Sequence, residues 1–422
     1  MKDELVCGID IGSSKIATIV GVNLKEDKET RIIGFNSTPS KGVKKGLIVD
    51  IEEVTIAVEE SVEKAERMAG RKINKAFVSV GGPHIASLNS HGIVAVSNPQ
   101  SEIVYTDMDR AIDAARAISL SNAKRIIEVS PRDYIVDGQD GIRNPIGMSG
   151  VRLEVETHII TASQTNLRNI DRVLEDLDIQ NLGFVFAGLS SAECVLTDTE
   201  KDLGAVLVDI GGGKIDLCIY IEGALSYSSS IPVGARHITN DIAVGLRVSL
   251  DTAEKIKLQL EQHIASKKNV TRKTILESSL SELHLDEKVK DISIGAVTDG
   301  IIAPRLEEIY KLVFEEIEKS GFGDSIPSGL VVTGGGALTV GILDSGKQVV
   351  GLPIRVGVPQ KVSGLIDEII FPQYATCVGL ILYAKGNIMP EENRINFNKV
   401  LKDFSVTDSL SKFKNLIKQF IP

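Results

Sequence analysis

Two stretches of this chain decide its fold: Gly8-Ile-Asp-Ile-Gly-Ser-Ser-Lys-Ile16 and Val208-Asp-Ile-Gly-Gly-Gly-Lys-Ile215. Both contain Asp-Ile-Gly-x-x-Lys-Ile, and each opens about half of the 422-residue chain. A turn motif that recurs once in each half of a chain indicates an internal repeat. The sequence therefore predicts two related lobes that face one ligand.

The second copy has the composition of an anion-binding hairpin. Its apolar strand ends at Asp209, and the three glycines that follow let backbone N–H groups approach an anion closely. Apolar residues alternate with polar or small ones from Ile215 to Ile221, so a strand leads out of the turn. Walker A and dinucleotide-binding loops lead into a helix, which excludes both. A carboxylate beside bound phosphate is best used through Mg²⁺.

A third glycine-rich segment, Val331-Val-Thr-Gly-Gly-Gly-Ala-Leu338, runs from a strand into an apolar helix start. It suits close backbone approach to a nucleoside. A single Asp-x-Gly turn is more often a plain tight turn than a phosphate loop, because short motifs match by chance. Two matching copies in one chain favour a nucleotide site.

Composition excludes several other classes of protein. The formal net charge is −10 and Trp is absent, so neither the basic face nor the aromatic platform of a nucleic-acid-binding protein is expected. The four cysteines form no Cys-x-x-Cys pair and the six histidines show no metal-ligand spacing. The acidic N-terminus is not typical of a signal peptide, and no apolar run approaches the ~20 residues of a membrane-spanning helix. We therefore expect a cytoplasmic protein.

In their order along the chain, the three glycine-rich segments resemble the phosphate-1, phosphate-2 and adenosine motifs of the actin, Hsp70 and sugar-kinase superfamily. Over about residues 5–390 the chain is similar to the FtsA family of bacterial cell-division proteins. The stretches that look shared are Pro145-Ile-Gly-Met-Ser-Gly-Val-Arg152, Phe186-Ala-Gly-Leu-Ser-Ser191, Thr239-Asn-Asp-Ile-Ala243 and Ala253-Glu-Lys-Ile-Lys257. The resemblance implies an α/β, actin-like fold, in which two lobes close on ATP and Mg²⁺ and one lobe carries an inserted α+β subdomain.

The resemblance also implies a set of site residues. Asp10 and Asp209 would face Mg²⁺ through water, and Glu254 and Lys257 would meet the ribose and the base edge. An exposed helical pair is an equally weighted alternative for Glu254 and Lys257. The remaining positions would contact the phosphates or the adenosine: Gly12, Ser13, Ser14, Lys15, Gly211, Gly212, Gly213, Lys214 and Gly234 for the phosphates, and Gly334, Gly335, Gly336 and Ala337 for the adenosine.

The domain layout that follows from the resemblance has six parts. They are a first-lobe core (1–81 and 163–203), an inserted subdomain (82–162), a second-lobe core (204–235 and 301–389), a helical subdomain (236–300), a polar linker (390–408) and an amphipathic C-terminal helix (409–422).

One departure from the enzymatic relatives bears on chemistry. Bacterial actins and Hsp70 proteins carry Glu-Pro-x-Ala before phosphate-2, and its Glu helps to orient the attacking water; here Ala187 stands at that place. The loss of such help costs on the order of 10²–10⁴ in rate. We expect ATP binding, no catalytic side chain and at most slow hydrolysis. A PilM-like pilus-assembly protein and a small-molecule kinase of the same superfamily remain as alternatives.

The partners that the resemblance implies are those of a division adaptor. They are the tubulin-like protein FtsZ, whose C-terminal tail would dock on the helical subdomain, further copies of the chain in a filament, an anionic membrane surface and later division proteins. Arg305 is a candidate FtsZ contact, although a surface helical arginine is the alternative. The expected location is the cytoplasmic side of the cell membrane, peripheral, at the division septum.

The pattern of residues 409–421 predicts a helix that lies on a membrane surface. Thirteen residues at about 1.5 Å each span about 20 Å, too short to cross a hydrocarbon core of about 30 Å. A C-terminal helix packed on the body is the alternative, but the basic face and the polar linker favour the membrane. The apolar stripe and the cationic positions are Leu410, Phe413, Leu416, Ile417, Phe420 and Ile421, with Lys412, Lys414 and Lys418.

Overall fold

The structure is a computed structural model that describes residues 4–23, 30–98, 102–267, 271–283, 285, 287, 292–364 and 366–387. The chain divides into two compact units, residues 1–385 and 386–422, and the first is described here. The linker and the C-terminal helix expected at 390–422 lie outside the described residues. Within those residues no helix combines the length and the apolar character that crossing a membrane requires.

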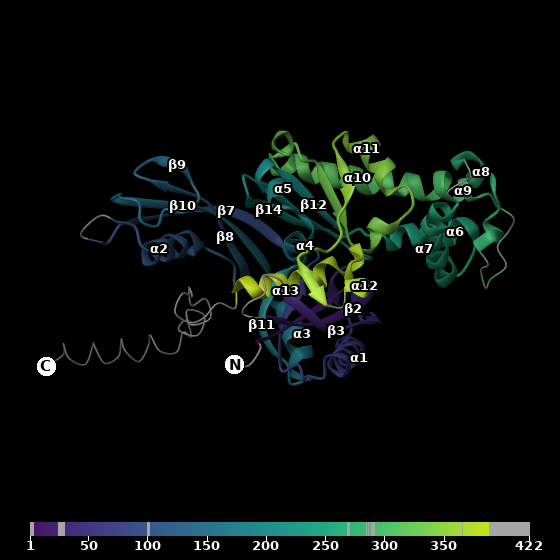
Figure 1. Cartoon of the computed structure of the whole chain (residues 1–422), viewed down its shortest axis with the longest axis horizontal. Helices are drawn as coiled ribbons and strands as arrows, with labels where there is room; N and C mark the ends of the chain where they lie inside the picture. Colours follow the sequence, from purple (N-terminus) through teal and green to yellow (C-terminus); the bar gives the residue numbers. More distant parts are fainter. Residues whose placement is uncertain are drawn as a thin grey trace. The chain divides into compact units, whose positions relative to one another are not determined.

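The first lobe is built on one six-stranded sheet (Figure 1). Its strands are β1 (Glu4–Ile11), β2 (Lys15–Asn23), β3 (Thr30–Pro39), β6 (Lys75–Val80), β11 (Gln180–Phe186) and β17 (Val362–Gly364). The order is β11-β6-β1-β2-β3-β17, with β1, β2 and β3 antiparallel and with β6 and β11 parallel to β1. A small hairpin of β4 (Val43–Lys44) and β5 (Leu47–Ile48) follows β3.

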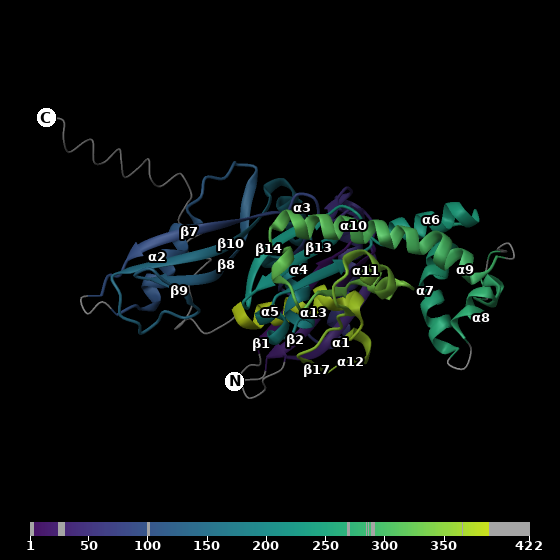
Figure 2. The same ribbon diagram turned by 90° about the horizontal axis from the view of Figure 1, so that it is seen from above.

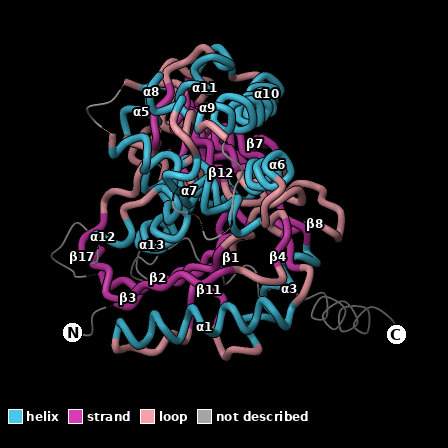
Figure 3. Tube along the Cα trace, turned by 90° about the vertical axis from the view of Figure 1, so that its right-hand side faces the viewer, coloured by secondary structure: helices cyan, strands magenta, loops and turns pink. Residues whose placement is uncertain are grey.

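Helix α1 (Ile51–Ala69) covers one face of this sheet, where the apolar spacing from Val54 to Ala65 predicts a helix (Figure 3). The Asp50 side chain caps its start by accepting from the Glu53 N–H at 3.0 Å. Gly70, at φ 61°, ends it in the left-handed conformation that glycine adopts without strain. Helix α3 (Gln164–Glu175) lies beside α1 and leads into β11.

The second lobe repeats the first. Its strands are β12 (Ala205–Ile210), β13 (Ile215–Ile221), β14 (Ala224–Ile231), β15 (Leu330–Thr333) and β16 (Ile354–Val356), in the order β14-β13-β12-β15-β16. As in the first lobe, three antiparallel strands are followed by two strands that run parallel to the first of the three. Two sheets of one design confirm the two related lobes that the repeated motif predicts and agree with the actin-like fold that the resemblance implies.

Helices of the second lobe pack into one apolar core with its sheet. They are α6 (Arg236–Leu246), α7 (Leu250–Ser266), α8 (Arg272–Glu277), α9 (Ile294–Val297), α10 (Ala303–Ser320) and α11 (Ile342–Val350), whereas the short α12 (Ile366–Ile369) follows β17 of the first sheet. Helix α10 runs along the sheet (Figure 2) and buries Leu306, Ile309 and Tyr310 completely. At about 25 cal/mol per Å² of apolar surface, side chains of this size each stabilise the core by about 2 kcal/mol.

The inserted α+β subdomain has its own sheet, in the order β7-β10-β8-β9. Its elements are β7 (Ala86–Ala95), α2 (Tyr105–Arg116), β8 (Lys124–Val136), β9 (Gln139–Ile142) and β10 (Arg152–Ser163). The sequence pattern predicts α2 at about 107–118, two residues too late. Asp107 lies inside the first turn, where its buried carboxylate reaches back to the Val104 N–H at 3.2 Å. An acidic side chain is favourable both at the N-cap and at the third helical position, so the sequence alone does not show which of the two Asp107 occupies.

Side-chain hydrogen bonds join this insert to β14 of the second lobe. The Ser87 hydroxyl donates to the Ser228 carbonyl at 2.7 Å. The buried His158 ring lies between Asn89 Oδ1 (2.7 Å from Nδ1) and the Ser228 hydroxyl (3.0 Å from Nε2). Burial, with a smaller effect of the Arg132 charge, lowers the pKa of His158 to about 3, so the ring is neutral at neutral pH.

Two helices connect the lobes, and they touch through backbone. Helix α4 (Ala187–Val195), which the short α5 (Asp198–Leu203) follows, leads from the first sheet to the second, and α13 (Ala375–Asn387) follows the return. A Cβ at Gly379 would overlap the carbonyl of Ser190, and the Ser190 hydroxyl donates to the Thr376 carbonyl at 2.7 Å. Glycine is therefore required for this crossing of α4 and α13.

Candidate nucleotide site

The two glycine hairpins meet face to face. A Cβ built on Gly212 would overlap the hydroxyl of Ser14, and one built on Gly213 would lie 2.9 Å from the Ser13 hydroxyl. The Ser13 hydroxyl also accepts from the Gly46 N–H at 2.9 Å. The fold thus brings together the two loops that the sequence predicts to hold phosphate, and a side chain added at Gly212 or Gly213 would crowd the serine of the opposite loop.

The two predicted metal-facing carboxylates, Asp10 and Asp209, stand at the ends of β1 and β12. Asp10 Oδ1 accepts from the Ser79 hydroxyl at 2.6 Å, while burial raises its pKa and Lys214 and Lys15 oppose that shift. The described residues contain no group of three or more His, Cys, Asp or Glu that could hold a metal. These two carboxylates fit a Mg²⁺ that keeps most of its water ligands and is coordinated by phosphate oxygens. They do not fit a metal ion that is coordinated entirely by protein side chains.

Asp209 is 6% exposed and receives two hydroxyl hydrogen bonds on one oxygen. Its Oδ2 accepts from Ser191 Oγ at 2.5 Å and from Thr376 Oγ1 at 3.0 Å. Its Oδ1 lies against Gly334, where a Cβ would overlap it, and Gly334 has φ 83°. A side chain at position 334 is therefore excluded both by space and by backbone conformation.

The two lysines of the hairpins sit in different surroundings. Lys15 lies 5.2 Å from the centre of the Tyr374 ring, and burial lowers its pKa. Lys214 forms an ion pair with the buried Asp216, which also accepts from the Ser230 hydroxyl at 2.7 Å. Burial lowers the pKa of Lys214 as well. The charges of both amines interact with those of Asp10 and Asp209. Both amines would therefore also attract a polyanion that binds beside these carboxylates.

At the predicted nucleoside end, Glu254 and Lys257 form an ion pair on α7, in which the lysine is buried and the glutamate side chain is 44% exposed. Lys257 is 5% exposed and donates to Thr239 Oγ1 at 2.9 Å and to Glu254 Oε2 at 2.7 Å. Burial lowers its pKa. Gly234 packs on the backbone of Gly211 and Gly212, which ties this end to the second hairpin.

The third glycine segment turns sharply after β15. Residues Gly335–Leu338 form a 3-10 turn, and the next regular helix, α11, begins only at Ile342. The sequence predicts that an apolar helix starts at once here, so the turn is tighter than predicted. A Cβ at Gly336 would overlap Ile210 of β12, whereas the buried Ala337 donates its N–H to the Gly334 carbonyl at 3.1 Å. Gly335 has more room, because the nearest atom to a Cβ there would be the Gln373 Cβ at 3.9 Å.

Ala187 is the first residue of α4 and is 3% exposed, so no carboxylate occupies the expected water-positioning place. The nearby side chains that could replace it are engaged elsewhere. The Ser190 hydroxyl donates to the Thr376 carbonyl, and Glu193 pairs with Lys201 at 2.9 Å. The described geometry around α4 thus offers no obvious substitute for the missing Glu.

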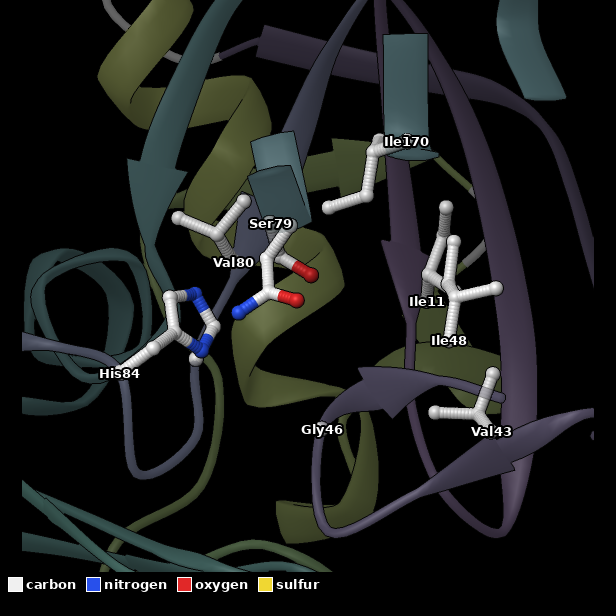
Figure 4. A pocket seen from close by; sticks show the side chains of 10 residues that line it. Ile11, Val43, Gly46, Ile48, Ser79, Val80, His84 and Ile170 are labelled. Carbon is white, nitrogen blue, oxygen red and sulfur yellow. The ribbon is translucent and has the colours of Figure 1, made fainter. Parts of the chain in front are cut away.

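A small cavity behind Ser79 was not predicted from the sequence (Figure 4). It holds about 10 Å³, which is about the space of one water molecule, between Ile11, Ser79, His84 and Ile170. Both ring nitrogens of His84 are buried without a hydrogen-bond partner among the described residues, and burial together with the Lys214 charge lowers its pKa to about 4. The ring is therefore neutral at neutral pH.

Arg305, the predicted partner contact, lies at the start of α10. It binds Asp241 with Nε at 2.5 Å and Glu308 with Nη1 at 2.5 Å. An open pocket of about 250 Å³ surrounds it, lined by Asp241, Gly300, Ile301, Pro304, Arg305 and Glu308. The nine predicted membrane-contacting residues between Leu410 and Ile421 lie outside the described part of the chain.

Sequence analysis did not single out four residues that the structure places around the site: Ser79, Ser191, Asp216 and Thr376. Ser191 closes one of the stretches that resemble the family, but the sequence does not show that this serine is buried beside Asp209. Thr376 is a hydroxyl inside the apolar run Tyr374–Ala384. Ser79 gives no signal, because its partner is distant in sequence.

Two sheets of one strand order, with facing hairpins between them, define an actin-like, two-lobed protein. Solved structures agree. The chain is similar to the PilM-PilN type IV pilus biogenesis complex (TM-score 0.62, 14% identity, 91% of this chain and 99% of that one). It is also similar to MreB 5 of Spiroplasma citri bound to AMPPNP (TM-score 0.52, 15% identity, 92% of this chain and 97% of that one). At such identities the likeness is one of fold alone.

Sequence comparison gives the family. A family model described as "SHS2 domain inserted in FTSA" matches residues 82–161, and one described as "Cell division protein FtsA" matches 206–379. Cell division protein FtsA of Pseudomonas aeruginosa is 37% identical over 380 residues, covering 90% of this chain and 89% of the relative. That of Bacillus subtilis is 35% identical over 414 residues, covering 97% and 90%. This chain belongs to the FtsA family of cell-division proteins, which favours the division interpretation over pilus assembly.

Proposed function

We propose that this chain binds ATP with Mg²⁺ between its two hairpins. The observation that carries the proposal is the meeting of Ser14 with Gly212 beside two carboxylates and two lysines. Backbone N–H groups of the glycine loops and the two amines would hold the phosphates, and Asp10 and Asp209 would hold waters of the metal. The bound Mg²⁺ would neutralise phosphate charge and fix the phosphate geometry.

Isothermal titration of the purified chain with ATP, in Mg²⁺ and in EDTA, tests this proposal. Saturable binding at one site that tightens with Mg²⁺ is the expected result. Heat that does not saturate in either buffer, from protein with a cooperative unfolding transition, would contradict it.

We further propose that hydrolysis is slow, because Ala187 offers no group to orient a water. A general base or a positioning group usually contributes 10²–10⁴ in rate, in order of magnitude. The steady-state rate of phosphate release should therefore be about 10²–10⁴ times lower than that of a bacterial actin measured under the same conditions. Equal rates would show that another group orients the water.

The proposed role of the protein is that of a membrane-bound adaptor in division. The chain would polymerise on the inner membrane surface, tether the FtsZ ring to the membrane and recruit later division proteins at the septum. Exposed apolar side chains on the insert, Ile93, Tyr105 and Val151, support self-association through this subdomain. Filaments on lipid with ATP, seen by electron microscopy, are expected. Persistent monomers on lipid would count against assembly.

The tail prediction supplies the membrane contact. Each Lys near an anionic lipid surface adds about 1 kcal/mol, and immersed apolar side chains add more. Co-sedimentation with anionic liposomes should be lost when the chain is truncated at Asp408, and reduced by Phe413→Glu with Ile417→Glu. Undiminished sedimentation of the truncated chain would exclude the tail as the anchor.

The pocket around Arg305 supports docking of the FtsZ tail. Arg305 pairs with the partly exposed carboxylates of Asp241 and Glu308, one of which a carboxylate of the peptide would replace, and the Ile301 and Pro304 walls of the pocket suit an apolar side chain. Titration with an FtsZ C-terminal peptide should show weaker binding for Arg305→Ala than for Lys311→Ala, a matched change to an exposed residue of α10. Equal affinities of the two variants would show that the FtsZ peptide does not dock at Arg305.

A further inference from the structure

The Asp209 carboxylate forms a closed triangle with two buried hydroxyls. Ser191 Oγ lies 2.5 Å and Thr376 Oγ1 lies 3.0 Å from Asp209 Oδ2, and the two hydroxyl oxygens are 3.0 Å apart. Ser191 is 0% and Thr376 is 9% exposed. Each hydroxyl has one hydrogen, so only two of the three contacts are hydrogen bonds at once. An ionised carboxylate attracts both hydrogens, because charge-assisted bonds are the stronger ones.

The three corners of the triangle come from three different elements. Asp209 ends β12 in the second sheet, Ser191 is on α4 and Thr376 is at the start of α13. The two helices are held together just beside the triangle, where Gly379 of α13 packs directly on the Ser190 backbone of α4. The two donors are therefore fixed before any ligand arrives.

We propose that Ser191 and Thr376 are positioning residues that orient Asp209 toward nucleotide-bound Mg²⁺. Both hydroxyls use Oδ2, which leaves Oδ1, the oxygen beside Gly334, for a water of the metal. Groups that orient the ligands of a metal typically contribute 10–100-fold to metal affinity. This inference rests on the proposed binding of ATP with Mg²⁺.

A purely structural role is the alternative, since a buried carboxylate needs partners in any case. The two roles differ in what they change. A structural role alters the stability of the chain and leaves the effect of Mg²⁺ on nucleotide binding untouched. A positioning role alters the ratio between the dissociation constants of ATP measured in EDTA and in Mg²⁺.

The chain offers matched pairs of variants for this test. Thr376→Val removes the hydroxyl at nearly constant volume, and Thr376→Ser keeps it. Ser191→Ala removes a donor to Asp209, whereas Ser190→Ala removes an equally buried hydroxyl of the same helix that does not reach Asp209. Thermal unfolding in EDTA reports the stability of each variant, and the Thr376 pair carries the test if Ser191→Ala does not fold.

Titration of the full chain with ATP in EDTA and in Mg²⁺ then gives the ratio for each variant. Ser191→Ala and Thr376→Val should reduce the Mg²⁺-dependent gain in affinity about 10-fold or more, with a change below about 3-fold in EDTA. Ser190→Ala and Thr376→Ser should keep the gain of the unaltered chain. Equal ratios in all four variants would overturn this inference alone. No Mg²⁺-dependent binding by the unaltered chain would overturn the proposed function, and this inference with it.

Discussion

The two hairpins share one sequence pattern and differ in what holds them. In the first, Asp10 is held by Ser79, a neighbour in its own sheet, and Lys15 lies over Tyr374. In the second, Asp209 is held by Ser191 and Thr376, which belong to the helices that join the lobes. The first carboxylate is thus anchored within its lobe, and the second is anchored to the connections. Two copies of one motif can therefore share a sequence pattern and still be tied to different parts of the fold.

The largest expected effect separates the two carboxylates. Asp209→Ala should abolish binding of ATP with Mg²⁺, whereas Asp10→Ala should weaken it by about 10-fold, the lower end of the range for groups that orient a metal. The fold should survive Asp209→Ala, because Ser191 and Thr376 remain within 3.0 Å of each other and can share a hydrogen bond. Calorimetry measures both variants, and equal losses would erase the distinction between the hairpins.

The next effect concerns the contact between the hairpins. Gly212→Val should abolish nucleotide binding, and Gly212→Ala should weaken it about 10-fold, because any Cβ there overlaps the Ser14 hydroxyl. In the double variant with Ser14→Ala, the nearest side-chain atom becomes the Cβ at 3.0 Å, so most of the loss should be recovered. A double-mutant cycle on ATP affinity measures this coupling. Strictly additive losses would mean that residue 212 blocks the phosphate and not the opposite loop.

A smaller effect of opposite sign should appear at Asp216. This carboxylate pairs with Lys214, whereas Lys15 lies over an aromatic ring and has no ion pair of that kind within the described residues of its hairpin. Asp216→Asn keeps an acceptor for the Ser230 hydroxyl and frees the amine, so ATP should bind about 5-fold more tightly. Ser230→Ala is the control that leaves the charge in place. Weaker binding by Asp216→Asn, measured by the same titration, would show that the carboxylate positions Lys214 for the phosphate.

The smallest effect is a pH dependence of stability that comes from two histidines. The folded pKa values of His84 (about 4) and His158 (about 3) lie below the usual 6.5, so the unfolded chain binds these protons first. Above pH 6.5 both rings are neutral in the folded and the unfolded chain, and the free energy of unfolding is at its full value. As pH falls from 6.5 toward the folded pKa values, protons bind to the unfolded chain and the free energy of unfolding decreases. For His158 the loss at pH 6 is about 0.8 kcal/mol relative to pH 7.5.

Urea unfolding of the chain between pH 7.5 and pH 5 measures this slope. His158→Asn and His84→Asn should each flatten it. The change at His158, whose two nitrogens are bonded between the insert and β14, should also cost stability at pH 7.5, and the change at the unpartnered His84 should cost less. Unchanged slopes in both variants would assign the pH dependence to other groups.

The sequence predicts much of this fold because its decisive signals are local. The Asp-Ile-Gly-x-x-Lys-Ile copies, the apolar spacing of α1 and Gly70 are read within a few residues, and the structure agrees with each. Ser79, Ser191 and Thr376 could not be found in this way, because each acts on a partner 18 to 167 positions away. The pairing of Lys214 with Asp216 spans only two positions, but the sequence does not show that Asp216 is buried and that the lysine is the cation beside it.

The contact of Gly379 with the Ser190 carbonyl has a mechanical consequence. Where two helices cross with no side chain between them, they can neither approach nor slide without breaking backbone contacts, but they can still turn about the point of contact. A small rotation of one helix on the other at this crossing would therefore become a larger displacement at residues far from it. A methyl group added by Gly379→Ala would force the two backbones apart, and the helices would lose the contact that prevents them from sliding past each other.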